Sequence, residues 1–335
     1  MRRRDLLAGL LLTSAMNGRV SAQAQQPGKV YRIAIVHPSR PVSEMSETGF
    51  RFYRQLFTEL RQRGYVEGEN LIVERYSGAG QAQPFADMVE AVVRSNPDLI
   101  FSLGGRLTRA FKAATTTIPI IGYTEDPVAT GLVSSLAHPG GNITGVSNDP
   151  GPEVWAKRLA FLQEAIPTIS RIAFLFEPTR VLSAQGRVVR DAAQQAGISI
   201  VHIFRENPVT EAEYRRFFAV MQQEHVDAIV VADSGENITY RHLVVELANA
   251  AKLPAIYPYR DFVDVGGLMA YAVDQSDLSR QVAVQIDKIL KGTKPGEIPF
   301  YLATKFDLLI NLKTASSLGL EIPPSLIARA DEVIE

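Results

Sequence analysis

Short apolar runs alternate with longer amphipathic segments along most of the chain. The runs with strand character begin at Val30, Asn70, Pro97, Ile118, Ile169, Ile198, Val226 and Leu253. Apolar runs of about four to eight residues, separated by segments of helix length, are typical of buried parallel strands joined by helices. The pattern therefore predicts the order β-α-β-α-β-α-β in each half of the chain.

The two halves repeat one another. Val30–Pro38 and Ile169–Pro178 are both strand-like runs that end at a proline. The helical segment after each run ends at a glycine, Gly64 in the first half and Gly197 in the second, where glycine suits the left-handed helix cap. Two equal α/β halves in one chain of 335 residues predict two lobes with a cleft between them.

Three connecting segments are expected to cross between the lobes, and they cover residues 139–148, 266–274 and 305–312. We expect an N-terminal lobe of residues 29–146 plus 275–302 and a C-terminal lobe of residues 147–274 plus 303–335. The predicted fold class is α/β, with two Rossmann-like lobes that each contain a parallel sheet and are joined by a three-crossing hinge. Closure around a ligand is the natural motion of such a hinge.

The first 24 residues have the three parts of an export signal. Arg2–Arg4 are positively charged, Leu6–Leu12 form a short apolar run, and Ala22–Ala24 supply the small-x-small pattern of a cleavage site. The apolar run is far shorter than the roughly 20 residues that cross a bilayer. We expect cleavage near Ala24 and a periplasmic mature protein. The sequence has no cysteine, so we expect neither disulfides nor a lipid-anchor cysteine.

Composition and charge exclude further classes. Hydrophobic residues make up 46 % of the chain and charged residues 21 %, which is typical of a folded globular protein. Without the first 24 residues, Lys+Arg fall from 35 to 31 and Asp+Glu from 36 to 35, which leaves a net charge of −4. An acidic chain without a basic cluster is a poor nucleic-acid binder, so we expect no nucleic-acid partner.

Candidate ligand-binding residues follow the predicted strands, because ligands of open α/β sheets bind beyond the carboxyl ends of the strands. The candidates are His37, Ser39, Arg40, Gly105, Arg106, Tyr123, Thr124, Glu125, Asp126, Asn148, Glu177, Arg180, Asp233, Ser234, Tyr259, Tyr271 and Asp274.

Arginines among these candidates suggest an anionic ligand group. Gly104 and Gly105 follow a strand and precede a helix, which leaves backbone N–H groups for a carboxylate or phosphate, with Arg106 beside them. Arg40 and Arg180 occupy equivalent strand ends in the two halves. The alternative is an ordinary tight turn with solvated arginines. The tyrosines could stack on a planar ligand or simply pack at the hinge.

Catalytic and cofactor motifs are absent from the sequence. The five histidines are scattered, with none at the i, i+4 spacing of a metal site, and there is neither a Gly-x-Ser-x-Gly elbow nor a phosphate-binding Gly-x-x-x-x-Gly-Lys motif. We therefore expect a binding protein without a catalytic residue, metal or cofactor.

Several longer stretches resemble a known family, the ABC transporter substrate-binding proteins that include the tryptophan-binding TrpX-like proteins. The stretches are Gly64–Asn70, Ala113–Ile120, Asp126–Val133, Pro139–Ser147, Leu253–Tyr257, Gly266–Tyr271, Thr304–Lys313 and Ile322–Val333. The resemblance implies the type I periplasmic-binding-protein fold and an importer's permease and ATPase as partners.

The resemblance is weakest in the strand-end loops that are expected to contact the ligand. Gly104-Gly105-Arg106-Leu107 stands where family members often have Gly-Thr-Pro-Ala, and Asp233–Asn237 lacks the commoner Ser-Asp-Pro pattern. We therefore expect a small organic solute as the ligand, with an amino acid or an aromatic or other organic carboxylate as the candidates. A periplasmic ligand sensor that partners a membrane receptor without transport is the alternative function.

Overall fold

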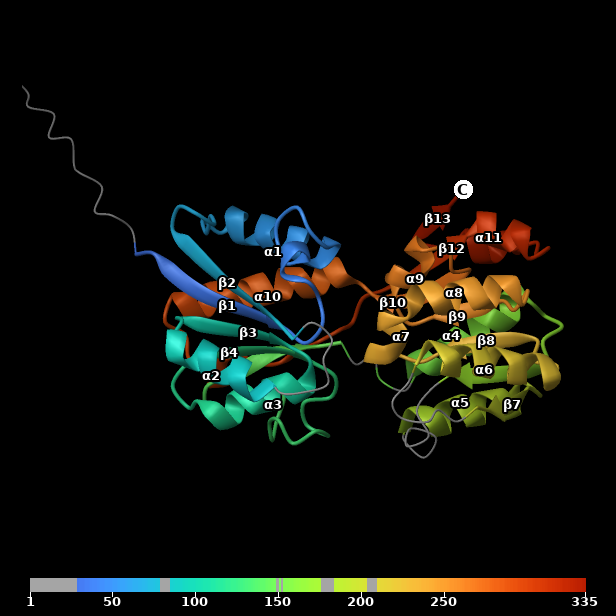
Figure 1. Ribbon diagram of the computed structural model, residues 1–335, viewed down its shortest axis with the longest axis horizontal. Coiled ribbons are helices and arrows are strands. Elements are labelled where there is room, and N and C mark those ends of the chain that lie inside the picture. The colour runs from blue at the N-terminus through green and yellow to red at the C-terminus, as the bar shows by residue number, and fades with distance from the viewer. Residues whose placement is uncertain (1–28, 79–84, 149–150, 152, 176–183, 204–209) are drawn as a thin grey trace, which may run out of the picture.

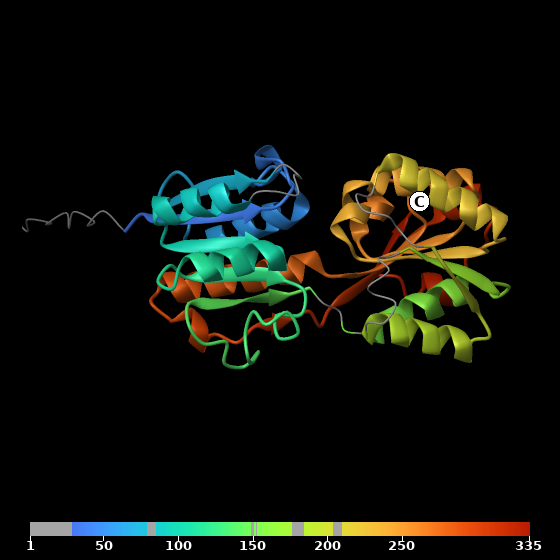
Figure 2. The ribbon, with the colours of Figure 1, turned by 60° about the horizontal axis from the view of Figure 1, so that its bottom comes forward.

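The computed structural model describes residues 29–335 except 79–84, 149–150, 152, 176–183 and 204–209. The chain forms two α/β lobes that lie side by side and are joined by a narrow waist (Figures 1 and 2). Among the described residues, no helix has both the length and the apolar character needed to cross a membrane. The predicted signal segment lies outside the described residues.

The first lobe contains a six-stranded sheet in the order β11-β5-β4-β3-β1-β2, in which every strand pair is parallel. Its strands are β1 (Tyr31–His37), β2 (Leu71–Ser77), β3 (Leu99–Leu103), β4 (Ile120–Thr124), β5 (Ile143–Ser147) and β11 (Tyr301–Leu302). Helices α1 (Arg51–Gln62) and α10 (Gln275–Leu290) cover one face of this sheet, and α2 (Phe85–Ser95) and α3 (Gly105–Ala114) cover the other. Two short 3-10 helices lie at 42–44 and 295–297.

The second lobe contains a seven-stranded sheet in the order β13-β12-β10-β9-β8-β6-β7. Its strands are β6 (Arg171–Leu175), β7 (Ser199–His202), β8 (Ala228–Val231), β9 (Ala255–Tyr257), β10 (Met269–Val273), β12 (Phe306–Asn311) and β13 (Glu332–Ile334). Only the β10–β12 pair is antiparallel among the paired strands that the structure describes. The sheet is therefore parallel-dominated, and β12 departs from the all-parallel expectation because the chain enters it directly from the other lobe.

Helices cover both faces of the second sheet as well. One face carries α4 (Glu153–Ala165), α5 (Ala184–Gln195), α11 (Leu312–Ser317) and α12 (Pro324–Ile327). The opposite face carries α6 (Glu211–Gln223), α8 (Arg241–Ala250) and α9 (Arg260–Asp264), and the short α7 (Gly235–Thr239) follows β8. The orders β2-β1-β3-β4-β5 and β7-β6-β8-β9-β10 correspond strand for strand, so the internal repeat expected from the sequence is present in the fold.

Three connections join the lobes. The chain leaves the first sheet after β5, returns between β10 and α10, and leaves again between β11 and β12. Asp274 begins α10, and its carboxylate accepts the backbone N–H groups of Ser276 at 2.8 Å and Asp277 at 3.1 Å. The predicted three-crossing hinge is thus observed, with one crossing ending in a capped helix.

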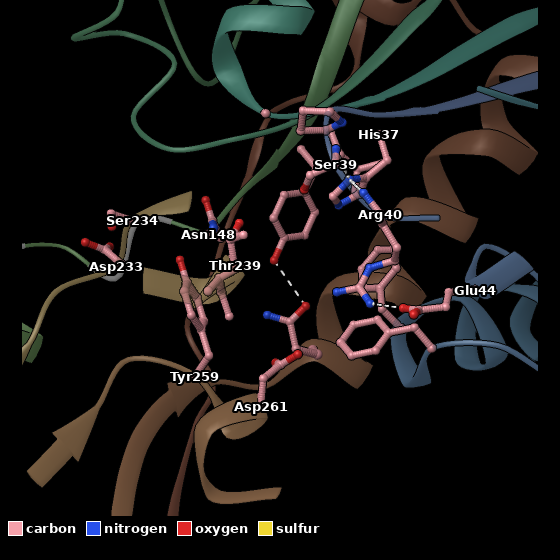
Figure 3. Close-up of a pocket in the computed structure, with 18 of the residues that line it drawn as sticks. His37, Ser39, Arg40, Glu44, Asn148, Asp233, Ser234, Thr239, Tyr259 and Asp261 are labelled. Atoms are coloured by element: carbon pink, nitrogen blue, oxygen red, sulfur yellow. Dashed lines mark hydrogen bonds and ion pairs between the residues drawn. The ribbon is translucent and has the colours of Figure 1, made fainter. Parts of the chain in front are cut away.

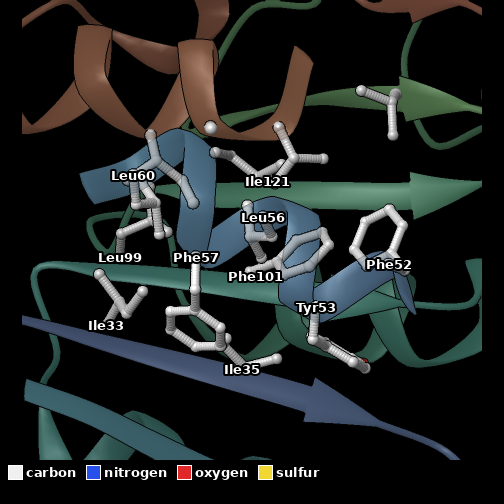
Figure 4. Packing of buried hydrophobic residues seen from close by; sticks show 14 of the residues in the cluster. Ile33, Ile35, Phe52, Tyr53, Leu56, Phe57, Leu60, Leu99, Phe101 and Ile121 are labelled. Carbon is white, nitrogen blue, oxygen red and sulfur yellow. The ribbon is translucent and has the colours of Figure 1, made fainter. Parts of the chain in front are cut away.

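Aromatic and aliphatic side chains of α1 and the central strands form the core of the first lobe (Figure 4). Phe101 on β3 is fully buried, and its ring centroid lies 6.1 Å from that of Phe52 on α1 in a stacked arrangement. Because Phe52 also lines the cavity described below, this core contact supports the cavity wall directly.

Replacing Phe101 with alanine tests this packing. We expect Phe101→Ala to lower the free energy of unfolding by about 3–5 kcal/mol, because a buried aromatic ring leaves a cavity that the sheet cannot close. Urea unfolding followed by circular dichroism measures the effect. Val128→Ala, at a position 42 % exposed, is the control, with an expected change within about 0.5 kcal/mol. Equal effects of the two substitutions would contradict the assigned core.

Candidate functional site

A cavity of about 450 Å³ lies between the lobes. Its wall is formed by the loops that follow β1, β3, β4 and β5 in the first lobe and β8 and β9 in the second, so the carboxyl ends of both parallel sheets face it (Figure 3). In the first sheet β1 lies beside β3, and in the second sheet β6 lies beside β8. At each of these places the chain continues to opposite sides of the strand pair. Ligands of open α/β sheets bind at such points.

His37 shapes the loop after β1. Its Nδ1 accepts the backbone N–H groups of Ser39 at 3.0 Å and Arg40 at 2.8 Å. Burial, together with the neighbouring charge of Arg40, lowers the pKa of His37 from 6.5 to about 3. The imidazole is therefore neutral at physiological pH, and it positions the loop that carries Ser39 and Arg40 along the cavity wall.

Arg40 already has two partners within its own lobe. One of its guanidinium nitrogens lies 2.6 Å from a carboxylate oxygen of Glu44, and its guanidinium carbon lies 3.6 Å from the centroid of the Phe50 ring. An ion pair combined with a cation–π contact holds the guanidinium against the wall. Its charge is thus largely balanced before any ligand arrives.

Aromatic side chains from α1 and β4 form the apolar part of the wall. The ring of Phe52 makes edge contacts with Tyr53 at 5.5 Å and Tyr123 at 5.6 Å between centroids. The Tyr123 hydroxyl donates to Gln275 at the start of α10 over 3.1 Å, which links β4 to the hinge (Figure 3). Burial raises the pKa of both tyrosines, so their hydroxyls stay protonated.

Among the described residues that line the cavity, two have a buried side-chain oxygen without a hydrogen-bond partner. These atoms are the hydroxyl oxygen of Tyr53, whose side chain is 1 % exposed, and the side-chain oxygen of Asn148. Unsatisfied buried polar atoms are uncommon in folded proteins. A ligand in the cavity would satisfy them.

The second lobe contributes Asp233, Ser234, Tyr259 and Asp261. Ser234 caps α7, and its hydroxyl accepts the backbone N–H of Asn237 at 3.1 Å. Burial, followed by the negative charge of Asp233, raises the pKa of Tyr259 well above 10. Burial also raises the pKa of Asp261, although the charges of Arg40 and Arg241 oppose it. This wall therefore presents carboxylates and a protonated phenol.

A buried arginine supports the second wall from behind. Arg158 on α4 is 1 % exposed, and it donates to the carbonyl of Tyr271 at 3.0 Å and to that of Pro258 at 3.4 Å. Its guanidinium carbon lies 4.4 Å from the Trp155 ring centroid. Burial lowers the pKa of Arg158, and the charge of Asp233 opposes that shift. Arg158 thus links the middle of β10 to the end of β9 and balances an acidic residue of the cavity, a role that sequence reasoning missed.

Most of the predicted ligand-binding residues come together at the cavity. Those that line it are His37, Ser39, Arg40, Gly105, Tyr123, Thr124, Glu125, Asn148, Asp233, Ser234 and Tyr259. Glu177 and Arg180 lie outside the described residues.

The structure places four predicted residues away from the cavity wall. Arg106 is exposed on α3, with its guanidinium carbon 5.8 Å from the Phe85 ring centroid. Asp126 accepts the backbone N–H groups of Val128 and Ala129, each at 2.9 Å. Tyr271 packs against Phe161 and Phe306 in the second lobe, and Asp274 caps α10. Local turns, caps and packing occupy these side chains.

Sequence reasoning also missed several lining residues. They are Glu44, Phe50, Phe52, Tyr53, Thr239, Arg241, Asp261 and Gln275. The aromatic group Phe50–Tyr53 at the start of α1 is the one signal that could have indicated them, because a helix that follows a strand-end loop begins near the ligand edge of the sheet. Metal chemistry has no support in the described ranges, where no group of three or more His, Asp or Glu is arranged to hold an ion.

Comparison with known proteins identifies a matching family and a related protein. Residues 49–334 match the family described as ABC transporter substrate binding protein. The tyrosine-binding protein of Clostridioides difficile (strain R20291) is 24 % identical over 264 residues, which cover 78 % of this chain and 74 % of that protein.

Solved structures show the same fold. A conserved domain protein from Vibrio cholerae superposes with a TM-score of 0.78 at 24 % identity, over 91 % of this chain and 100 % of that one. An ABC domain from Streptococcus pneumonia in complex with L-Trp gives 0.77 at 24 % identity, with the same coverage. The ligand-free, open structure of a substrate binding protein with adhesive properties from Clostridium difficile gives 0.66 at 21 % identity, over 91 % and 99 % of the two chains.

The buried, neutral His37 predicts a pH dependence of stability. Because its pKa is near 3 in the folded protein and 6.5 is the ordinary value, the unfolded chain binds a proton between these values that the folded chain does not. Stability should therefore fall as the pH drops from 6.5 towards 4, by at most about 1.4 kcal/mol per pH unit from this group. In His37→Gln, whose side-chain oxygen can accept the same N–H groups, urea unfolding should show a shallower decline. Parallel curves for the two proteins would rule out this role for His37.

Proposed function

Since the chain belongs to the ABC transporter substrate-binding protein family, we propose that it is the extracytoplasmic receptor of an importer. It binds a small organic solute in the cavity between the lobes and delivers it to a permease and an ATPase. The export signal expected from residues 1–24 supports a location outside the cytoplasm.

The observation that carries this proposal is a single cavity wall built from both lobes. Residues after β1 and β4 face residues after β8 and β9, and three connections join the two halves. A ligand that contacts both walls favours the arrangement in which they are close together, so binding is coupled to closure of the hinge. A permease can then distinguish the loaded protein from the empty one by its shape.

The cavity wall suits a small solute with an aromatic body. Phe52, Tyr53 and Tyr123 supply ring faces and edges, while the free oxygens of Tyr53 and Asn148 supply hydrogen-bonding sites. Pockets that combine mostly apolar walls with a few directed polar groups are typical of small-molecule sites. The names of two relatives, one a tyrosine-binding protein and the other a complex with L-Trp, support an amino acid or a similar aromatic solute.

We propose binding without catalysis. Several polar side chains of the wall are engaged in holding the loops, because His37 accepts two backbone N–H groups and Ser234 caps α7. Arg40 is paired with Glu44. Groups committed to structure in this way are suited to holding a ligand in a fixed orientation.

A ligand screen tests the proposal. Residues 25–335 would be heated with amino acids, amines, organic acids, sugars and nucleosides, and a solute at 100 times its Kd should stabilise the protein by about 2.7 kcal/mol. The melting temperature should then rise by several degrees. Loss of uptake of that solute in a strain lacking the gene identifies an importer. Binding with unchanged uptake would contradict delivery to an importer and indicate the sensor role.

Because the Tyr53 hydroxyl has no hydrogen-bond partner, its removal is expected to lower ligand affinity without lowering the stability of the empty protein. Tyr53→Phe should weaken binding of the identified solute by about threefold to tenfold, which corresponds to one lost hydrogen bond. The melting temperature of the empty protein should not fall, because this hydroxyl has no partner there. Calorimetric titration and thermal unfolding measure the two effects.

The matched control is Tyr65→Phe, which removes the 3.0 Å hydrogen bond from the Tyr65 hydroxyl to Asp287 in the same lobe, away from the cavity. This variant should be less stable and should bind the solute normally. The reverse pattern in the two variants would contradict the proposed ligand contact.

A further inference from the structure

Among the residues that the structure describes, the cavity wall carries more negative than positive side chains. Its carboxylates are Glu44, Glu125, Asp233 and Asp261, and its guanidinium groups are Arg40 and Arg241. A ligand that enters a site with low-dielectric walls experiences the sum of these charges. The sum disfavours an anion and favours a ligand that carries a positive group.

Two of the acidic residues have cations close by. Glu44 forms its ion pair with Arg40, and the buried Arg158 interacts electrostatically with Asp233. Arg241 donates to the carbonyl of Ile238 at 3.1 Å. The second wall therefore holds these charges in fixed positions.

Asp261 lies in the first turn of α9, on the cavity side opposite Arg40 and Glu44 (Figure 3). Within the part of the chain that the structure describes, no cation lies within 4.0 Å of the carboxylate of this partly buried residue, although the charges of Arg40 and Arg241 act on it from further away. A partly buried carboxylate gains a charge-assisted hydrogen bond when a cation comes into contact with it. The unpartnered Tyr53 hydroxyl, which is buried, faces the same cavity from the other lobe.

We propose that Asp261 binds a cationic nitrogen of the solute, so that the ligand class is a protonated amine with an aromatic body and its carboxylate is dispensable. This inference rests on the proposed solute-binding function. The ammonium group would form a charge-assisted hydrogen bond with Asp261, and the tyrosine and phenylalanine rings of the wall would add cation–π attraction. A ligand that the first lobe already holds would thus also contact the second lobe. Closure of the hinge requires such a contact.

The proposed amine differs from the anionic ligand group that the arginines of the sequence suggested. Arg106 lies away from the cavity, and the guanidinium of Arg40 is paired with Glu44. Arg180 is not among the described residues. The described positive charges on the wall are therefore outnumbered, and an amine is the ligand group that the wall selects.

Three indole compounds that differ only in their charged groups test the ligand class by calorimetric titration at pH 7.5. They are L-tryptophan, tryptamine, which lacks the carboxylate, and indole-3-propionate, which lacks the amine. We expect the amino acid and the amine to bind and the acid to bind at least tenfold more weakly than the amine. Binding of the acid without the amine would overturn the inference and leave solute binding intact. Binding of none would overturn the aromatic amine class, and the wider solute screen then decides the proposed function separately.

Asp261→Asn tests the residue. The substitution keeps the shape and removes the charge, so affinity for the compounds that bind should fall about tenfold to a hundredfold, the range for a hydrogen bond to a charged group. Asp264→Asn, on the same helix and paired with Arg260, is the matched control and should retain affinity. A melting temperature of the empty Asp261→Asn protein that is no lower than that of the unsubstituted protein confirms that it folds. Equal affinities of the two variants would overturn the role of Asp261.

Discussion

The direction of the strands is the constraint on which the rest of this structure depends. In a parallel sheet every strand ends at the same edge, and here the two sheets turn those edges towards one another across the hinge. The loops that follow β1, β3, β4, β5, β8 and β9 therefore add to the same cavity, although the residues come from positions as far apart as His37 and Asp261. The short connections through the waist keep the lobes paired and leave closure as the motion that remains.

Charge is balanced mainly within each lobe. Arg40 with Glu44 in the first lobe and Arg158 near Asp233 in the second hold their positions without help from the opposite side. These two pairings therefore persist when the walls separate. The groups left for an interaction across the cavity are the Tyr53 hydroxyl, the Asn148 oxygen and the Asp261 carboxylate. We propose that these groups determine the selectivity of the cavity and couple ligand binding to closure.

The sequence predicted the architecture well, because apolar runs and glycine-ended helices report directly on buried strands and their connections. The repeat, the parallel-dominated sheets and the three crossings were all predicted, and the reversed direction of β12 was not. The contacts that individual side chains make were harder to predict. Arg106 and Asp126 follow strand ends as expected, but Arg106 lies exposed on α3 and Asp126 holds a turn. Arg158 and Asp261 reach their positions only when their helices pack against the sheet, and local sequence patterns do not encode that packing.

The central claim is that a solute bound between the walls brings the lobes together. The chain contains no cysteine, so single cysteines placed at the exposed positions Glu90 on α2 and Arg215 on α6 can carry one spin label on each lobe without competing thiols. The distance between the labels would be measured by pulsed electron paramagnetic resonance while the identified solute is added. The account predicts a shift from one distance distribution to a distinct second one, complete at saturation. A saturating solute that leaves the distribution unchanged would contradict it.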